Sequence, residues 1–293
     1  RERFDLVHYS PLTVFSPIWF VPGKKTATVH GVEEVLFPQG YSRLHLAHEA
    51  LVMPSYMRRM DAVATVSETS KLFFVEKYGV RANRVFITTN GIGAAYRVIP
   101  ADERGRIPIT NIDRPYILHV SKYSARKNPD AIFRGFASFL SATGLDYLLV
   151  CAGRGWDSHE ATTAAQLAGI GNRYRAPGFV SEADAVSLLN GAEAFVFPSY
   201  AEGFGMPNLE AMACGCPVVT SGVFAIPEVV GDAAYVLSSP DAHEEIGQAL
   251  ARIAKDAGYK KALVSRGLER VKRYSWAESA RARSRSSCFS AAL

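Results

Sequence analysis

Cysteine is scarce in this 293-residue chain, which contains only four cysteines. Cys214 and Cys216 lie close together, but a single residue separates them and no group of histidines is nearby. Zinc-binding pairs and redox motifs usually place two residues between the thiols. The composition therefore argues against a zinc or disulfide site and predicts reduced thiols in a cytoplasmic protein. The cysteines are Cys151, Cys214, Cys216 and Cys288.

Long apolar runs are also lacking. No stretch approaches the roughly 20 apolar residues that a helix needs to cross a bilayer, and no signal peptide can be recognised. The chain begins at Arg1, without a methionine, and reaches a strand-like segment almost at once. We therefore expect that some sequence upstream is absent.

The net charge is small, at +5 from 33 basic and 28 acidic residues that are spread over most of the chain. This balance argues against a nucleic-acid partner. One exception is the basic stretch from Arg266 to Arg285. It is either a solvated helix face or a peripheral contact with an anionic membrane surface, on the cytoplasmic side.

Strand-like and helix-like segments alternate along most of the chain, which predicts an α/β fold with parallel sheets. Between 99 and 115 the pattern gives way to charged residues, proline and glycine, as at a domain boundary. We therefore expect an N-terminal domain over 1–105, joined by a helix over 277–293, and a C-terminal domain over 106–276. The expected strands are 4–10, 25–30, 62–67, 85–91, 116–121, 147–153, 173–180, 192–197 and 217–221, and the expected helices include 41–60, 68–78, 129–141, 158–167 and 181–192.

The segment PSYAEGFGMPNLEAMACGCPVVTS, at 198–221, follows an apolar strand and contains the carboxylates Glu202 and Glu210 and, between them, the glycines Gly203 and Gly205. Pro207 suits the first turn of a helix, so Glu202 to Gly205 form the loop that enters it. The free N–H groups of a helix N-terminus attract phosphate. Glu210, expected in the first helical turn, and Glu202 can accept hydrogen bonds from hydroxyls. The pattern thus favours a ligand with phosphates and hydroxyls; alternatively, Glu210 only favours the helix dipole and Glu202 is a surface residue.

This segment closely resembles the signature of the retaining glycosyltransferases of family four, whose GT-B fold has two facing Rossmann-like domains. The hallmark is a pair of glutamates separated by seven residues, matched here by Glu202 and Glu210. Further matches are TVHGVEEVLFP (28–38), AVATVSETSK (62–71), TNGI (89–92), ARKNPD (125–130), GFVSEADAVSLLNGAEAFVFPS (178–199), IPEVVGDAAYVL (226–237) and YSWAESA (274–280).

The resemblance implies a role for each matched residue. Glu202 would contact the donor sugar and Glu210 the ribose, while Lys127 would bind the diphosphate. The usual arginine partner of that lysine is Lys122 here, and the usual preceding glycine is Ser121. Lysine keeps the charge but not the bidentate fork, which Arg126 could supply. The implied donor-binding residues are Lys122, Arg126, Lys127, Phe179, Val180, Glu202, Gly203, Phe204, Gly205 and Glu210, with the main chain at 179–180 near the base and that of 203–205 facing the sugar and diphosphate.

The histidine of the acceptor-side loop is matched by His30, although the aspartate that follows in related sequences is Gly31 here. The residues closest to the chemistry would be His30, Lys127 and Glu202, with Glu202 as a binding group and not a nucleophile. Simpler interpretations are a structural role for His30 and a solvated loop for the cations at 122–127.

The family implies retention of configuration without a metal or other cofactor, the lysines and the helix terminus stabilising the leaving diphosphate. The ARKN motif resembles mannosyltransferases of polysaccharide or O-antigen assembly. We therefore expect GDP-mannose as donor, or else a UDP-sugar, and a saccharide or lipid-linked saccharide as acceptor. A paired-carboxylate hydrolase and a dinucleotide oxidoreductase fit less well, because the first has no use for diphosphate groups and Gly153-Arg154-Gly155 lacks the third glycine.

Family members usually begin with a strand and a glycine-rich loop that are not seen ahead of residue 4. We therefore expect an incomplete N-terminal domain. A non-catalytic nucleotide-sugar-binding or scaffold protein is the alternative function.

Overall fold

The computed structural model describes residues 4–10, 20–100, 103 and 112–285. By their contacts these form two compact units. The first comprises Arg1–Gly91, Ala201–Phe204 and Tyr274–Leu293, and the second comprises Ile92–Tyr200 and Gly205–Arg273. The first unit thus ends at Gly91 and includes a short segment of the glutamate-containing loop, whereas the sequence placed the boundary near residue 105.

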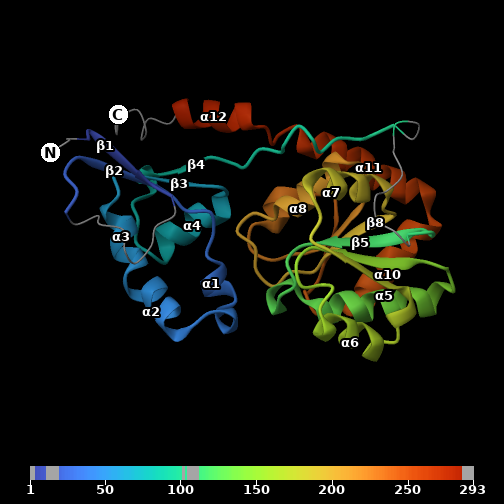
Figure 1. The fold of residues 1–293 in the computed structure, drawn as a ribbon. Helices are drawn as coiled ribbons and strands as arrows, with labels where there is room; N and C mark the ends of the chain where they lie inside the picture. Colours follow the sequence, from blue (N-terminus) through green and yellow to red (C-terminus); the bar gives the residue numbers. More distant parts are fainter. Residues whose placement is uncertain (1–3, 11–19, 101–102, 104–111, 286–293) are drawn as a thin grey trace. The chain divides into compact units, whose positions relative to one another are not determined.

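The N-terminal unit has a parallel sheet in the order β1-β2-β3-β4. Strand β3 is buried along its whole length, as expected when helices cover both faces of a parallel sheet. Helix α12 returns to pack against β4 (Figure 1). The elements are β1 (Leu6–Tyr9), β2 (Lys24–Thr28), α1 (Glu33–Leu36), η1 (Pro38–Gly40), α2 (Arg43–Leu51), α3 (Met53–Arg59), β3 (Ala62–Thr65), α4 (Glu68–Glu76), η2 (Ala82–Arg84), β4 (Val85–Ile87) and α12 (Trp276–Arg285).

The stretch predicted as one helix over 41–60 is two helices, α2 and α3, that meet at Val52. Pro54 stands in the first turn of α3. Proline is tolerated there because the first helical N–H groups have no partner, but it cannot continue a preceding helix. Pro54 therefore marks the start of a second helix, which the prediction of one helix over 41–60 overlooked.

The C-terminal unit has a six-stranded parallel sheet in the order β10-β9-β8-β5-β6-β7. Helices α5, α6 and α10 cover one face, and α7, α8 and α11 lie on the other (Figure 1). The elements are β5 (Tyr116–Val120), η3 (Ala125–Lys127), α5 (Pro129–Thr143), β6 (Leu148–Ala152), α6 (His159–Leu167), η4 (Gly171–Arg173), β7 (Tyr174–Gly178), α7 (Glu182–Gly191), β8 (Ala194–Phe197), α8 (Met206–Ala213), β9 (Val218–Ser221), α9 (Ile226–Val230), β10 (Tyr235–Leu237), α10 (His243–Lys255) and α11 (Ala257–Val271).

The strand order reverses direction between β5 and β8, because β6 and β7 follow on one side and β9 and β10 on the other. In open parallel sheets, ligands bind beyond the carboxyl ends of the strands at such a switch point. The loops that leave β5 and β8 carry the predicted lysines and glutamates, respectively. The topology therefore places both loops at the switch point of this sheet.

Helices α5 and α10 pack so closely that glycine is required where they meet. A Cβ atom added to Gly135 would lie 2.6 Å from Cγ2 of Ile246, and one on Gly247 would lie 2.6 Å from Oγ of Ser138. Phe133, which is fully buried, joins α5 to the aromatic core beneath the sheet. This rigid layer supports the loop that precedes α5.

Part of the basic stretch is engaged within the protein. Arg270 on α11 donates from Nε to the carbonyl oxygen of Val229 at 2.8 Å, and a second hydrogen bond reaches the carbonyl of Glu228. Arg281 pairs with Glu278 on α12. A contact with an anionic membrane surface stays a prediction for this region.

Candidate active site

The loops that follow β5 and β8 are joined through the main chain of Arg126. Its carbonyl oxygen accepts a hydrogen bond from Oγ of Ser199 at 3.1 Å and another from the N–H of Tyr200 at 2.9 Å. Ser199 itself is buried. The predicted cation loop is therefore attached to the start of the segment that leads to Glu202.

Lys127 is buried, with 8% of its side chain exposed, and its Nζ lies 4.5 Å from the centroid of the Phe197 ring. A cation above an aromatic face is stabilised electrostatically when little water reaches it. Asn128 follows in the left-handed conformation and caps α5 by accepting from the N–H of Ala131. The solvated-loop interpretation is therefore wrong for Lys127, whereas Lys122 is exposed and Arg126 half-buried.

Ser121 occupies the position where related sequences have glycine, and its hydroxyl bonds to a buried histidine. Oγ of Ser121 lies 2.6 Å from Nε2 of His119, whose Nδ1 lies 2.8 Å from the carbonyl oxygen of Val196. A carbonyl only accepts, so Nδ1 carries the proton and Ser121 donates to Nε2. Burial lowers the pKa of His119 to about 3, which keeps it neutral.

The main chain of Ser121 also explains a required glycine on the neighbouring loop. A Cβ atom at Gly153 would lie only 1.9 Å from the carbonyl oxygen of Ser121, and Gly153 has φ +125°. Nε1 of Trp156 donates to the same oxygen at 2.8 Å. The loops after β5 and β6 are thereby held against each other at the predicted site.

Helix α8 begins at Met206, after Gly205 at φ 86° as the N-cap, with Pro207 in the first turn as expected. Glu210 is therefore its fifth residue, and the prediction that it lies in the first turn is wrong. A dipole effect fades beyond that turn, so helix stabilisation alone does not account for this carboxylate. Burial, followed by the negative charge of Glu182, raises the pKa of Glu210 to about 7.

The segment Ala201–Phe204 groups with the N-terminal unit. Glu202 is only 7% exposed, so the interpretation of it as a surface residue is wrong. The N–H of Gly203 donates to Oε1 of Glu33 at 3.0 Å, and a Cβ atom at Gly203 would lie 2.6 Å from the carbonyl oxygen of His30. The side chain of His30 is exposed. Sequence reasoning did not single out Glu33, because only the fold brings it to Gly203.

Phe204 contributes to packing in the same unit. Its ring makes an edge-to-face contact with Tyr274 at 5.6 Å between centroids, and Phe204 is buried. Tyr274 is buried as well. The direction in which the main chain of 203–205 faces a ligand stays a prediction.

A cavity of about 450 Å³ lies at the carboxyl ends of β5, β6 and β7 in the C-terminal unit. It combines three of the predicted donor-binding residues, Lys122, Phe179 and Val180, with side chains that sequence reasoning did not assign. Tyr96 was missed because it precedes β5 in a segment without periodicity, and Glu182 because the sequence indicated only the start of a helix at 181. The lining residues are Tyr96, Val120, Ser121, Lys122, Gly153, Arg154, Phe179, Val180, Ser181, Glu182 and Ala185.

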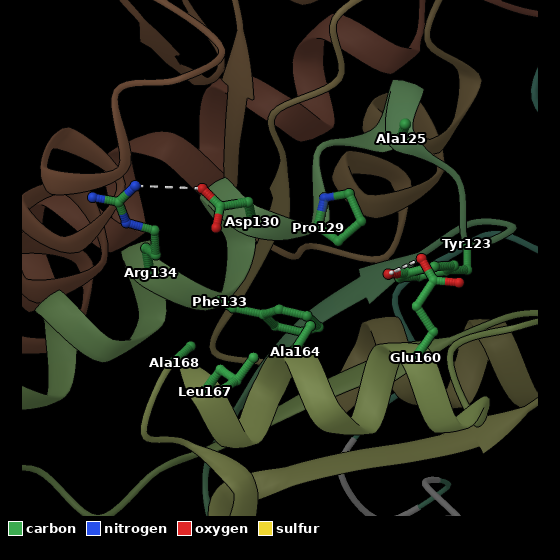
Figure 2. Close-up of a pocket in the computed structure, with 10 residues that line it drawn as sticks. All are labelled: Tyr123, Ala125, Pro129, Asp130, Phe133, Arg134, Glu160, Ala164, Leu167 and Ala168. Carbon is green, nitrogen blue, oxygen red and sulfur yellow. Dashed lines mark hydrogen bonds and ion pairs between the residues drawn. The ribbon is translucent and has the colours of Figure 1, made fainter.

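A larger cavity of about 530 Å³ lies between α5 and α6 (Figure 2). Its charged and polar groups face one another: Asp130 pairs with Arg134 at 3.5 Å, and Tyr123 donates to Glu160 at 3.4 Å. The rest of the wall is mainly apolar, including Phe133 (Figure 2). The two carboxylates outnumber Arg134 there, whereas the smaller cavity contains Lys122 and Arg154 beside one carboxylate, so the smaller cavity is the better candidate for an anionic ligand.

Among the described residues, no cluster of three or more potential metal ligands is found, and no helix is long and apolar enough to traverse a membrane. Three of the cysteines are free and buried, and burial raises the pKa of each thiol. Such thiols are poor nucleophiles. Cys288 lies outside the described residues; the three are Cys151, Cys214 and Cys216.

The family described as glycosyl transferases group 1 matches residues 103–270, which is more than half of the chain. The chain belongs to this family. Its relatives include the O-antigen chain mannosyltransferase B of Escherichia coli, 28% identical over 287 residues, with 94% of this chain and 74% of that protein covered. The serotype-specific mannosyltransferase WbdA of the same species is 26% identical over 283 residues, covering 93% of this chain. This chain spans only 34% of the length of WbdA.

Solved structures agree with this assignment. The structure of Anabaena HepE in complex with UDP-glucose has a TM-score of 0.75 at 18% identity, covering 92% of this chain and 73% of that one. The structure of WaaG, a glycosyltransferase involved in lipopolysaccharide biosynthesis, has a TM-score of 0.73 at 18% identity, covering 87% and 72%. The predicted α/β fold of the GT-B class is thus confirmed, and so is the prediction that the chain is a glycosyltransferase.

Proposed function

We propose that this group 1 glycosyltransferase moves a mannosyl residue from a nucleoside-diphosphate sugar to a saccharide or lipid-linked saccharide acceptor, with retention of configuration. The donor that we favour is GDP-mannose, and a UDP-sugar is the alternative. The curated relatives that act as mannosyltransferases support the choice of sugar.

One observation carries the proposal: the cations at 122–127, the cavity and Glu210 belong to loops and helices at the switch point of a single sheet. In this arrangement Lys127, desolvated over Phe197, would stabilise the charge that develops on the departing diphosphate. Lys122, on the rim of the cavity, would hold the same group. We include no metal, because these side chains supply the positive charge that a cation supplies elsewhere.

Glu210 and Glu202 would bind hydroxyl groups. At the pKa of about 7 that burial imposes, Glu210 can either accept from or donate to the ribose diol. Glu202 would contact the sugar that is transferred, and we assign it no nucleophilic role. The acceptor hydroxyl would attack the anomeric carbon from the face on which the nucleoside diphosphate leaves, and the leaving phosphate would accept the proton of that hydroxyl.

A transfer assay tests the proposal. Purified protein is incubated with GDP-mannose or UDP-glucose and a mannose-terminated oligosaccharide, and products are resolved by mass spectrometry and NMR of the anomeric configuration. We expect an α-linked product from GDP-mannose, and a rate at least about 100-fold lower for Lys127→Gln. The control is Lys255→Gln, an exposed lysine at the end of α10, which should leave the rate unchanged.

Glu202→Ala separates binding from chemistry. We expect it to abolish transfer while GDP still binds, since GDP lacks the sugar. Donor binding without transfer or hydrolysis by the wild-type chain would favour a non-catalytic binding protein. An inverted product would refute retention, and a β-linked product would therefore end this part of the proposal.

A further inference from the structure

The 450 Å³ cavity contains two features that the diphosphate and sugar contacts leave unused. One is an exposed aromatic ring with a guanidinium group over it, and the other is a carboxylate at the start of α7. Both follow the carboxyl ends of β6 and β7, next to Lys122 on the cavity wall.

Phe179 is 71% exposed, which is unusual for a phenylalanine in so well packed a unit. The guanidinium carbon of Arg154 lies 5.3 Å from the centroid of its ring. A flat aromatic face and a planar cation at the wall of a cavity form a surface on which a nucleobase can stack. Stacking of this kind tolerates every base, so it supplies affinity and no selectivity.

Glu182 offers the selective group. Helix α7 is already capped by Ser181 and Asp184, which exchange side-chain and main-chain hydrogen bonds, so Glu182 is not needed for that purpose. Among the described residues, its carboxylate has no hydrogen bond or ion pair. Its negative charge contributes to the raised pKa of Glu210, after burial, and to the raised pKa of Tyr96, after burial and the charge of Glu210.

The chemistry of a carboxylate determines which base it can bind. Ionised glutamate only accepts hydrogen bonds, and it prefers two adjacent donors. Guanine presents such a pair on its Watson–Crick edge, the ring N1–H and the exocyclic amino group. Uracil presents one N–H between two carbonyl oxygens, which would repel the carboxylate, and adenine presents an acceptor beside its amino group.

We propose that Glu182 recognises the guanine base of a GDP-sugar donor, with the ring stacked on Phe179 and Arg154. This proposal rests on the proposed function, because it assumes that the cavity holds the nucleotide of the donor. It assigns base selectivity to one side chain and base affinity to the stacking pair.

Isothermal titration calorimetry with GDP, IDP, UDP and ADP tests the proposal. For the wild-type chain we expect GDP to bind at least about tenfold more tightly than UDP or ADP. IDP, which lacks the exocyclic amino group, should fall between GDP and UDP. Glu182→Ala should bring all four affinities to within about twofold of one another, whereas Phe179→Ala should weaken all four by a similar factor.

The matched control is Glu244→Ala, which removes an exposed acid from the first turn of α10 and should preserve the preference for GDP. A thermal denaturation curve for each variant shows whether the substitution destabilises its helix. A loss of stability alone would not alter the relative affinities for the four nucleotides. A wild-type preference for UDP, or an unchanged ratio of GDP to UDP affinity in Glu182→Ala, would overturn this proposal and leave the proposed function intact. If no nucleoside diphosphate binds, both this proposal and the proposed function fail.

Discussion

Replacement of Glu210 by glutamine should change how the stability of the protein depends on pH. Burial and the nearby Glu182 raise the pKa of Glu210 from its ordinary value of 4.5 to about 7. Between these two values the unfolded chain releases a proton that the folded chain retains. The free energy of unfolding therefore falls as the pH rises from about 4.5 to about 7, and stays lowered above it.

The magnitude follows from the same two pKa values. A difference from 4.5 to about 7 corresponds to about 3 kcal/mol, since one pKa unit is about 1.4 kcal/mol. Glutamine has a similar shape and no charge, so its contribution does not vary with pH. Glu210→Gln should accordingly match the wild type near pH 4.5 and exceed it by about 3 kcal/mol near pH 8.

Urea unfolding of both proteins at pH 5, 6, 7 and 8, without nucleotide, measures this difference directly. Glu244→Gln controls for the loss of an exposed carboxylate. Glu182→Gln provides an internal check, because the charge of Glu182 is the smaller of the two causes of the raised pKa of Glu210. This variant should reduce the pH-dependent loss of unfolding free energy without abolishing it. Parallel curves for the wild type and Glu210→Gln over the whole range would refute the reasoning.

Three further predictions concern the supports of the site. Asn128 has φ 56° and caps α5, so Asn128→Ala should lower the free energy of unfolding by about 1–2 kcal/mol. Asn128→Gly should lower it by less, because glycine adopts this backbone conformation without strain. Chemical denaturation of both variants measures the difference. Gly135→Ala should destabilise by about 1–3 kcal/mol, because its Cβ would lie 2.6 Å from Ile246; an unchanged unfolding midpoint would contradict this contact. His119→Phe should cost about 1–3 kcal/mol by leaving the carbonyl of Val196 without its donor, and full stability by the same assay would contradict the importance of this hydrogen bond.

The sequence was most informative about strands and helix starts. Continuous apolar runs such as 116–121 become strands of a parallel sheet, and Pro207 with Gly205 marks the start of α8. These signals are local, because a strand's burial and a helix's first turn depend on residues within the segment itself. The same reasoning placed Glu210 one turn too early, since the left-handed Gly205 starts the helix at Met206.

Residues whose partners are distant in the sequence could not be predicted in this way. Tyr96 reaches the wall of the cavity from an irregular segment, and Glu33 reaches the N–H of Gly203 across 170 residues. Tyr96 belongs to no matched motif, and Glu33 lies within TVHGVEEVLFP without any signal for its partner, so each obtains its partner only from the tertiary fold. Glu182 lies inside the matched stretch 178–199, which predicted the helix over 181–192 but indicated no role for this side chain.

The exchange of the usual glycine for Ser121 shows why one position at the switch point tolerates a side chain and its neighbour does not. At Gly153 a Cβ atom would collide with a carbonyl oxygen of the adjacent loop, and no rotamer can relieve a contact between backbones. At Ser121 the side chain instead points to Nε2 of His119, a neutral acceptor that burial holds unprotonated. The hydroxyl is therefore satisfied within the protein. A serine here adds no charge beside Lys122, so the positive charge expected to hold the diphosphate is preserved despite the departure from the family pattern.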